Sequence, residues 1–319
     1  MTSFSIITPV LNMADHIGAC IESVATQSVD KELLIMDGGS TDGTLEVIRS
    51  HNYPWLKLIS EKDEGQSSAI NKGLRMATGE FFNWLNADDV LSENALKAVG
   101  SKMSPSVDVI LGKCNHVNMD TDEVVATGRT NVYSTTEKTL ANFSMAQPSH
   151  FYRTEKVLAL GGLNNGLNLT MDMDLWFRYV LKNGISKVVT IDTVLSNFNL
   201  HGRSKTTTLA SEMSKEKYSV FLALLNSISA PKWLKEHVRT KASTHTLEYN
   251  VGGFDSTQFL SEFAFHLMQE SYEVGDLKTA GSLFDLVKQG NRLNEGELFE
   301  WRIRTKGTSG RIIRKLRQR

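Results

Sequence analysis

The N-terminal part of the chain alternates between two hydrophobic periodicities, and this alternation is the feature that most limits the possible folds. Short apolar runs typical of buried strands occupy residues 4–8, 33–37, 56–60 and 81–85, and amphipathic helical patterns occupy residues 17–27, 44–51 and 67–77. Such a series predicts a mostly parallel sheet flanked by helices, because right-handed crossovers place each helix against the sheet. The sequence therefore predicts an α/β fold.

Polar or small residues follow each of the predicted strands. The strand ends read Thr8-Pro9, Asp37-Gly38-Gly39-Ser40, Ser60-Glu61-Lys62-Asp63 and Asn86-Ala87-Asp88-Asp89. In open α/β sheets, ligands bind in the crevice beyond the carboxyl ends of the strands. We therefore expect these segments to line one crevice.

Two adjacent carboxylates, Asp88 and Asp89, follow the apolar run at residues 81–85. Carboxylates at the end of a buried strand supply the hard oxygen ligands that Mg²⁺ or Mn²⁺ prefers. The alternative interpretation is that both residues cap the helix expected to begin near Ser92. This stretch alone does not separate a metal site from a helix cap.

Asp37 ends another predicted strand and is followed by a glycine-rich turn. Its carboxylate could accept a hydrogen bond from a ribose hydroxyl or a base N–H, or it could simply form a tight turn with an Asx cap. The turn is neither a G-x-G-x-x-G nor a G-x-x-x-x-G-K-[ST] loop, and this weakens both the dinucleotide-oxidoreductase and the P-loop interpretations.

The chain is long enough for a large α/β domain and a smaller one. We expect the first domain to occupy residues 1–210 and a helical C-terminal region with a basic tail to occupy residues 211–319. Predicted helices in that region occupy residues 214–225, 231–249, 257–272, 277–289 and 294–306. This helical region is where acceptor or partner specificity would lie.

Composition bears on the compartment and on the partners. The formal net charge of −1 shows no overall basic bias, so no nucleic-acid partner is expected. Cys20 shares a helical stripe with apolar residues, which favours a core thiol and a reducing compartment. No basic segment precedes the first apolar run, and no apolar stretch approaches the roughly 18 residues needed to span a bilayer. We expect a cytoplasmic protein.

Several motifs together resemble the family-2 glycosyltransferases, which have the GT-A fold. They are Ile7-Thr8-Pro9-Val10-Leu11-Asn12, Ser23-Val24-Ala25-Thr26-Gln27, the turn from Asp37 to Thr44, Asp63-Glu64-Gly65-Gln66, Ala69-Ile70-Asn71-Lys72-Gly73, Ala77-Thr78-Gly79-Glu80, Trp84-Leu85-Asn86-Ala87-Asp88-Asp89, Gln147-Pro148, Gly161-Gly162-Leu163-Asn164 and Met171-Asp172-Met173-Asp174-Leu175-Trp176-Phe177-Arg178. The resemblance covers about residues 4–205. It implies a GT-A-like (Rossmann-like) catalytic domain that uses a nucleotide-diphosphate sugar, with a UDP-sugar favoured.

The resemblance also implies which residues contact the donor. Thr8, Pro9 and Asp37 would hold the base, and Asp63 and Asn86 the nucleoside. Asn12, Lys72 and Ala87 would complete the donor site, and Asp88 would hold a Mg²⁺ or Mn²⁺ ion that bridges the diphosphate.

His201 follows a strand-like run and shares its loop with Arg203 and Lys205. The family often has a histidine here, so His201 is a second candidate metal or diphosphate ligand. The alternative interpretation is a solvent-exposed histidine in a polar loop.

Asp172 is the candidate catalytic base. It precedes Leu175, Trp176 and Tyr179 at helical spacing, so on a helix it shares their inward stripe. Asp174 points elsewhere and is expected to pair with Arg178 in water. The resemblance agrees, because Asp172 matches the acid that serves as the base in inverting members. An ordinary N-cap is the alternative interpretation.

The sequence therefore predicts metal-assisted, inverting transfer of a sugar to a hydroxyl of a saccharide or lipid-linked saccharide, in polysaccharide or glycolipid biosynthesis. A sugar-nucleotide nucleotidyltransferase and a non-catalytic glycan-binding protein are the alternatives. A basic tail from Arg302 to Arg319 could rest on an anionic membrane at its inner face, or it could be a solvated tail.

Overall fold

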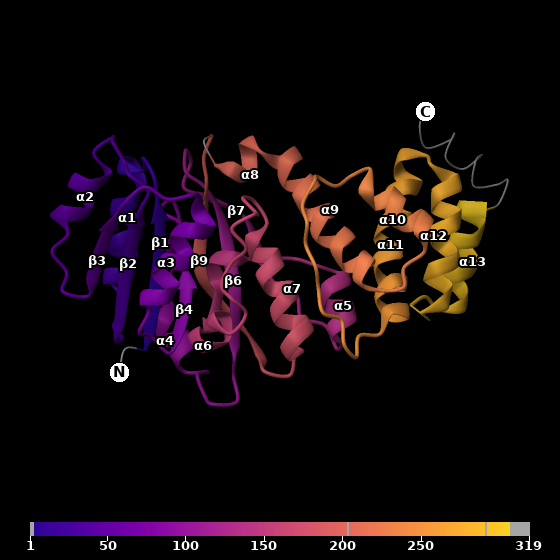
Figure 1. Ribbon diagram of the computed structural model, residues 1–319, viewed down its shortest axis with the longest axis horizontal. Helices are drawn as coiled ribbons and strands as arrows, with labels where there is room; N and C mark the ends of the chain where they lie inside the picture. Colours follow the sequence, from indigo (N-terminus) through magenta and orange to yellow (C-terminus); the bar gives the residue numbers. More distant parts are fainter. Residues whose placement is uncertain (1–2, 203, 291, 307–319) are drawn as a thin grey trace.

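The computed structural model describes residues 3–202, 204–290 and 292–306, and Figure 1 shows the sheet at one end of the long axis and the helical region at the other. The strands are β1 (Phe4–Val10), β2 (Lys31–Asp37), β3 (Leu56–Ser60), β4 (Phe81–Trp84), β5 (Val90–Leu91), β6 (Val109–Asn118), β7 (Glu123–Arg129), β8 (His150–Arg153) and β9 (Val188–Leu200). The helices are α1 (Ala14–Ala25), α2 (Thr44–Ser50), α3 (Gln66–Met76), α4 (Ala95–Gly100), α5 (Thr136–Ala141), α6 (Thr154–Leu158), α7 (Met171–Asn183), α8 (Lys205–Thr208), α9 (Ala210–Ser227), α10 (Lys232–Arg239), α11 (Ser256–Val274), α12 (Leu277–Gln289) and α13 (Glu295–Lys306), with a short 3-10 helix at Gln147–Ser149.

The strands form one mixed sheet in the order β3-β2-β1-β4-β8-β6-β9-β5, with β7 paired to β6. β3, β2, β1 and β4 are parallel, as the alternation of strands and helices predicts. Beyond β4 the sheet departs from a mostly parallel arrangement, because β8 is antiparallel to β4 and to β6, and β7 is antiparallel to β6. A short turn between β6 and β7 replaces the helical crossover that parallel neighbours need.

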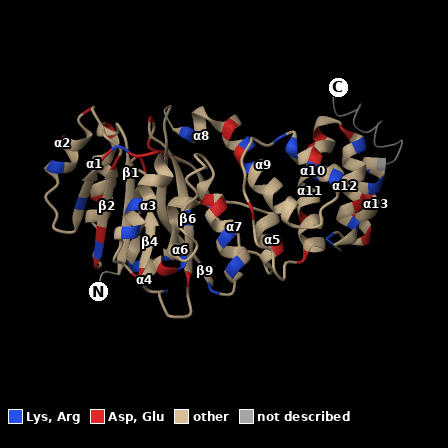
Figure 2. Cartoon of the chain, in the orientation of Figure 1, with Lys and Arg blue, Asp and Glu red and all other residues tan. Residues whose placement is uncertain are grey.

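Both faces of the parallel strands are buried, and successive residues belong to different cores. In β1, Ile6 packs with α1 and α2 residues on one face, and Ile7 packs with α3 and α7 residues on the other. This alternation follows from the two-residue period of a strand. Both cysteines are free and buried, as a core thiol predicts. Figure 2 shows both signs of charge along the length of the chain.

The helical region continues the core on the α7 side of the sheet. Residues of α9, α11 and α12 belong to the same apolar cluster as those of α7, and Phe177 packs edge-on against Phe221 with ring centroids 5.6 Å apart. One predicted helix, residues 231–249, is wrong in length because α10 ends at Arg239. The stretch that follows contains Ser243, Thr244 and Thr246, whose side chains compete for backbone hydrogen bonds and disfavour a helix. Among the described residues, no helix is both long and apolar enough to cross a membrane.

Candidate active site

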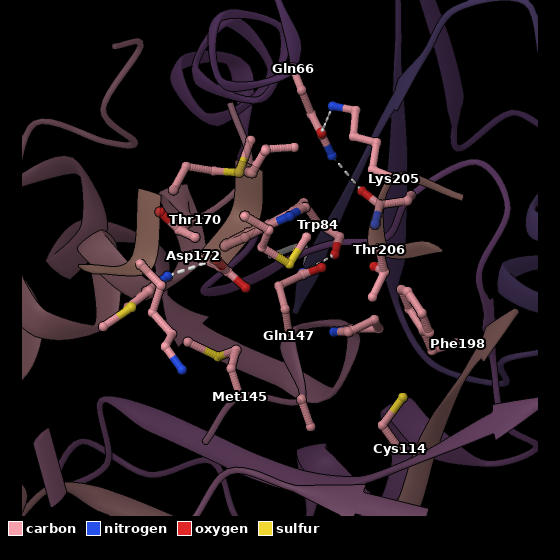
Figure 3. A pocket seen from close by; sticks show the side chains of 18 of the residues that line it. Gln66, Trp84, Cys114, Met145, Gln147, Thr170, Asp172, Phe198, Lys205 and Thr206 are labelled. Atoms are coloured by element: carbon pink, nitrogen blue, oxygen red, sulfur yellow. Dashed lines mark hydrogen bonds between the residues drawn. The ribbon is translucent and has the colours of Figure 1, made fainter. Parts of the chain in front are cut away.

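Two cavities lie side by side beyond the carboxyl ends of the parallel strands. The first, which we call the strand-end cavity, has a volume of about 450 Å³ and lies beside Pro9, Asp63 and Asp88. The second, the α7 cavity, has a volume of about 340 Å³ and is shown in Figure 3. The two cavities share wall residues, which are Gln66, Asn86, Phe198, Lys205 and Thr206. A ligand in one cavity can therefore reach a ligand in the other.

Asp88 and His201 form the polar end of the strand-end cavity. Asp88 Oδ2 lies 3.0 Å from His201 Nε2, and both side chains are partly buried. The backbone carbonyl of Asp88 accepts a hydrogen bond from Asn199 Nδ2 at 2.7 Å, which ties this turn to the end of β9. The His201 ring stacks on His16 of α1, with centroids 4.7 Å apart.

The neighbouring carboxylate has a different environment. Asp89 is fully buried and accepts hydrogen bonds from Asn86 Nδ2 at 3.1 Å and from the backbone N–H of Asn199 at 3.2 Å. Burial, together with the charge of Asp88, raises the pKa of Asp89 well above its usual value. α4 begins at Ala95 after Asn94, so neither acid caps that helix. Asp88 alone of the pair lines the cavity.

Asp88 and His201 fit a divalent cation by their chemistry. A carboxylate oxygen suits Mn²⁺ and Mg²⁺, histidine is a common metal ligand, and Mg²⁺ often takes one or two carboxylates with waters and substrate phosphates. Within the described ranges, no group of three or more His, Cys, Asp or Glu side chains could hold a metal ion. Diphosphate oxygens and water would therefore have to complete the coordination.

The other predicted donor residues divide into those that line the strand-end cavity and those that lie outside it. The lining residues are Pro9, Asn12, Asp63, Asn86, Ala87, Asp88 and His201. Asn12 adopts a positive φ of 54°, and its Oδ1 accepts a hydrogen bond from the N–H of Thr41 at 2.9 Å. The Asp63 carboxylate lies against Gly38, where an added Cβ would come within 2.8 Å of Asp63 Oδ2.

Thr8, Asp37 and Lys72 lie outside the lining of both cavities. Thr8 is buried with its hydroxyl 3.7 Å from Cys20 Sγ, and Lys72 Nζ forms an ion pair with Glu61 at 2.9 Å. The Asp37 carboxylate accepts hydrogen bonds from the Ser60 hydroxyl at 2.6 Å and from the N–H groups of the following turn. Burial acts to raise the pKa of Asp37, but these hydrogen bonds outweigh it and hold the pKa below its usual value. Asp37 therefore stabilises its own turn, and its contact with the base stays a prediction.

A chain of hydrogen bonds in the shared wall was missed by the sequence analysis. Lys205 Nζ donates to Gln66 Oε1 at 2.8 Å, and Gln66 Nε2 donates to Asn86 Oδ1 at 2.8 Å. Desolvation lowers the pKa of Lys205 from its usual value. Gln66 belongs to a motif and Lys205 to the loop of His201, but their separation of 139 positions in the chain hid the contact from local sequence patterns.

Asp172 lies in the first turn of α7 and lines the α7 cavity, where Figure 3 shows it near Gln147 and Trp84. Its Oδ1 accepts a hydrogen bond from the N–H of Met173 at 2.8 Å. Burial, with a smaller contribution from the negative charge of Glu216, raises the pKa of Asp172 to about 6. A carboxylate with this pKa can accept a proton near neutral pH.

Asp174 differs from its predicted environment. It is buried, its Oδ2 accepts a hydrogen bond from Arg178 Nε at 2.8 Å, and its Oδ1 accepts one from the Tyr249 hydroxyl at 2.9 Å. The prediction that this ion pair lies in water is therefore wrong, because the loop after α10 covers this side of α7. The prediction that Asp174 pairs with Arg178 is confirmed.

Comparison with known proteins finds a family match in the N-terminal part of the chain. The glycosyl transferase family 2 model matches residues 5–158. Chondroitin synthase of Escherichia coli is 27% identical over 234 residues, which are 70% of this chain and 32% of that protein. A PGL/p-HBAD biosynthesis glycosyltransferase of Mycobacterium bovis is 44% identical over 94 residues, or 28% of this chain and 37% of that protein. The chain thus spans about a third of the length of these curated relatives.

Solved structures share the fold. Residues 1–349 of TarS from S. aureus, in complex with UDP-GlcNAc, align with a TM-score of 0.58 and 17% identity over 90% of this chain and 82% of that one. The mannosyltransferase PcManGT from Pyrobaculum calidifontis, in complex with GDP-Man and Mn²⁺, aligns with a TM-score of 0.55 and 17% identity over 96% and 84% of the two chains.

The mixed sheet and these structural neighbours show that the chain has a GT-A fold. Residues 5–158 match the glycosyl transferase family 2 model, the family that the motifs predict.

Proposed function

We propose that the chain transfers a sugar from a nucleotide-diphosphate sugar to a hydroxyl of a saccharide or lipid-linked saccharide, with a divalent cation and with inversion, in polysaccharide or glycolipid biosynthesis. One observation carries the proposal: the cavity beside Asp88 and His201 shares a wall with the cavity beside Asp172. The family match supports a transferase over a nucleotidyltransferase or a non-catalytic glycan-binding protein.

The strand-end cavity is the proposed donor site. Its volume of about 450 Å³ falls within the range of ligand pockets, and it has a mixture of apolar and polar walls. Pro9, Asp63 and Asn86 would contact the nucleoside there. A UDP-sugar is the favoured donor, and the TarS complex with UDP-GlcNAc supports this choice.

Asp88 and His201 would hold Mg²⁺ or Mn²⁺ at the diphosphate, and the PcManGT complex with Mn²⁺ supports a divalent cation in this fold. The bound cation would supply Lewis-acid stabilisation of the negative charge that develops on the departing diphosphate. Lys205, whose ammonium lies at the wall between the cavities, adds a positive charge from the protein itself.

Asp172 is the proposed base on the acceptor side. The acceptor oxygen forms a bond to the anomeric carbon as the bond from that carbon to the diphosphate breaks, and the diphosphate leaves with the electron pair. The hydroxyl proton passes to the Asp172 carboxylate. A single displacement of this kind inverts the anomeric configuration.

The expected site of action is the cytoplasm, at the inner face of the membrane if the basic C-terminus contacts lipid. Residues 307–319, which carry most of that predicted basic segment, lie outside the described residues. Flotation with anionic liposomes at low and high salt tests the contact. Equal recovery in the aqueous fraction of the full chain and of a version ending at Thr305 would refute it.

A panel of donors tests the function. The full chain is incubated with Mn²⁺ and UDP-GlcNAc, UDP-glucuronic acid, UDP-glucose or GDP-mannose, and both thermal shift and release of nucleoside diphosphate are measured. We expect one donor to stabilise the protein and to be turned over, and EDTA to abolish both effects. Absence of binding and of release across the panel would contradict the proposal.

A further inference from the structure

A buried carboxylate from the helical region contacts the segment that leads into α7. Glu216 of α9 is 4% exposed. It accepts hydrogen bonds from the backbone N–H groups of Asn168 at 3.1 Å, Leu169 at 2.7 Å and Thr170 at 2.6 Å. The Thr170 hydroxyl donates a fourth, at 3.0 Å. A single side chain thus orders three consecutive peptide groups before the helix.

These contacts determine where α7 begins. Thr170 occupies the N-cap position of α7, and its own side chain makes no capping hydrogen bond to the helix. The segment before the helix therefore depends on Glu216 for its hydrogen bonds. Asp172 lies two residues after Thr170, in the first turn, so a change in the start of the helix changes the position of the Asp172 carboxylate.

Burial of Glu216 needs compensation, because a carboxylate removed from water loses its hydration. His245 Nε2, on the loop that follows α10, lies 3.5 Å from the Glu216 carboxylate. The short hydrogen bonds from the 168–170 segment are the main compensation, since a carboxylate that accepts several N–H groups is strongly stabilised. The contact therefore stabilises both partners. Glu216 of α9 orders residues 168–170, and their N–H groups stabilise the buried Glu216 carboxylate.

We propose that Glu216 is a positioning residue that holds the start of α7 and thereby the Asp172 carboxylate at the wall of the α7 cavity. This inference rests on the proposed role of Asp172 as the base. It gives the helical C-terminal region a part in the transfer reaction, although the region contributes neither the proposed base nor the proposed metal ligands.

The charge of Glu216 has a second effect on Asp172. Among the causes that raise the pKa of Asp172, burial is the largest and the negative charge of Glu216 is a further one. Among the described residues, the other ionisable groups beside Asp172 or in the lining of the same cavity are Tyr152 of β8, Cys114, His116, Lys205 and Lys217. Removal of the Glu216 charge should therefore lower the pKa of Asp172.

Two substitutions separate position from charge. Glu216→Gln keeps the length of the side chain and removes the charge, whereas Glu216→Asp keeps the charge and shortens the reach. Glu262→Gln is the matched control, because Glu262 is a buried acid of the same helical region that pairs with Arg292 and accepts a hydrogen bond from Asn142, not from the segment before α7. Circular dichroism first establishes which variants are folded.

Three measurements follow on the full chain. Hydrogen exchange measures the protection of the backbone amides of residues 168–173. ¹³C NMR of labelled aspartate measures the pKa of Asp172, and the Asp172→Asn variant identifies its signal. Donor turnover over a pH series gives kcat and KM. In both Glu216 variants we expect faster exchange of these amides and a kcat reduced about ten- to hundred-fold, with donor KM unchanged, because small misplacement of a reacting group has effects of this size. In the plot of kcat against pH, only Glu216→Gln should shift the fall in kcat at acidic pH to lower pH values.

The results distinguish this inference from the proposed function. Suppose that Asp172→Asn abolishes turnover while a folded Glu216 variant keeps the hydrogen exchange and kcat of the wild type. The positioning role of Glu216 is then refuted, and the assignment of Asp172 as the base stands. If exchange and the Asp172 pKa respond while Asp172→Asn turns over normally, the base assignment fails and Glu216 is confirmed as the residue that orders α7. Should Glu216→Gln fail to fold, Glu216→Asp carries the exchange and kcat tests.

Discussion

Asp88 and His201 are 113 residues apart in the chain, yet Asp88 Oδ2 lies 3.0 Å from His201 Nε2. The contact depends on β5, a strand of two residues that directly follows Asp89. Val90 pairs with Asn197 and Leu91 pairs with Ser196, so β5 places the end of β4 beside the end of β9. The two candidate metal ligands therefore meet through a local antiparallel pairing, although β4 and β9 are not neighbours in the sheet.

Replacement of Asp88 by alanine tests this pair as a metal site. We expect Asp88→Ala to abolish turnover and to remove the Mn²⁺-dependent part of nucleotide binding, because Asp88 is the carboxylate of the pair that lines the cavity. Calorimetric titration with UDP, with and without Mn²⁺, measures the binding. Asp120→Ala, at an exposed position beyond the end of β6, is the matched control. Full turnover of the wild type in excess EDTA would contradict the prediction.

The pH dependence of turnover follows from the pKa of Asp172, which burial raises to about 6. A base must be deprotonated to act, so kcat should be at its plateau above this pKa and fall as the pH drops through about 6. Initial rates with saturating donor between pH 4.5 and 8.5 measure the limb, and a parallel circular dichroism series excludes unfolding. A limb near the ordinary aspartate pKa would show that Asp172 does not control the rate.

The same shift predicts an effect on stability with a definite sign. The pKa of Asp172 is higher in the folded protein than the usual value of 3.8, so the folded state binds the proton more tightly. The contribution of Asp172 to stability is therefore fully present below about pH 4 and is lost as the pH rises through about 6. At pH 8, Asp172→Asn should be more stable than the wild type by roughly 1–3 kcal/mol. Urea unfolding measures the difference, and no gain in stability would contradict it.

Local patterns in the sequence were sufficient to predict the parallel strands β1 to β4 and to place both ends of two elements. The predicted strand at residues 56–60 and the predicted helix at residues 277–289 coincide with β3 and α12. Such elements are determined by apolar periodicity and by glycine and proline breaks within a short window. The position of Asp172 on a helix that ends at Asn183 was predictable for the same reason.

The remaining features depend on residues far apart in the sequence, which periodicity does not reveal. Glu216 contacts Thr170 across 46 residues, and Tyr249 contacts Asp174 across 75. The burial of Asp174 follows from this covering loop, whereas the isolated helix pattern placed Asp174 in water. Asp89 gave no signal that distinguished it from Asp88, because their different burial depends on Asn199 from the end of β9.

Tyr249→Phe tests how firmly the helical region holds α7. The Tyr249 hydroxyl donates to the buried Asp174 at 2.9 Å, and its removal should lower the free energy of unfolding by about 1–3 kcal/mol, as expected for a hydrogen bond to a buried charged group. Tyr218→Phe, which removes a hydroxyl bound to the more exposed Glu270, is the matched control and should have a smaller effect. If both variants lose the same free energy of unfolding in urea, the hydrogen bond to Asp174 of α7 stabilises the protein no more than the one to Glu270.

Replacement of Asp172 by asparagine tests the base directly. The amide keeps the size of the carboxylate but cannot take up the proton of the attacking hydroxyl, so kcat should fall by about 10²- to 10⁴-fold. The affinity for the nucleotide sugar should stay nearly unchanged. Asp174→Asn is the matched control on the same helix. It should weaken the buried contacts with Arg178 and Tyr249 and lower stability, but the folded fraction should retain much of its turnover. Rapid mixing measures kcat, titration with the donor measures its affinity, and NMR of the product shows the anomeric configuration of the new linkage. Near-normal turnover of Asp172→Asn, or a product that keeps the anomeric configuration of the donor, would refute the assignment of Asp172 as the base of an inverting transfer.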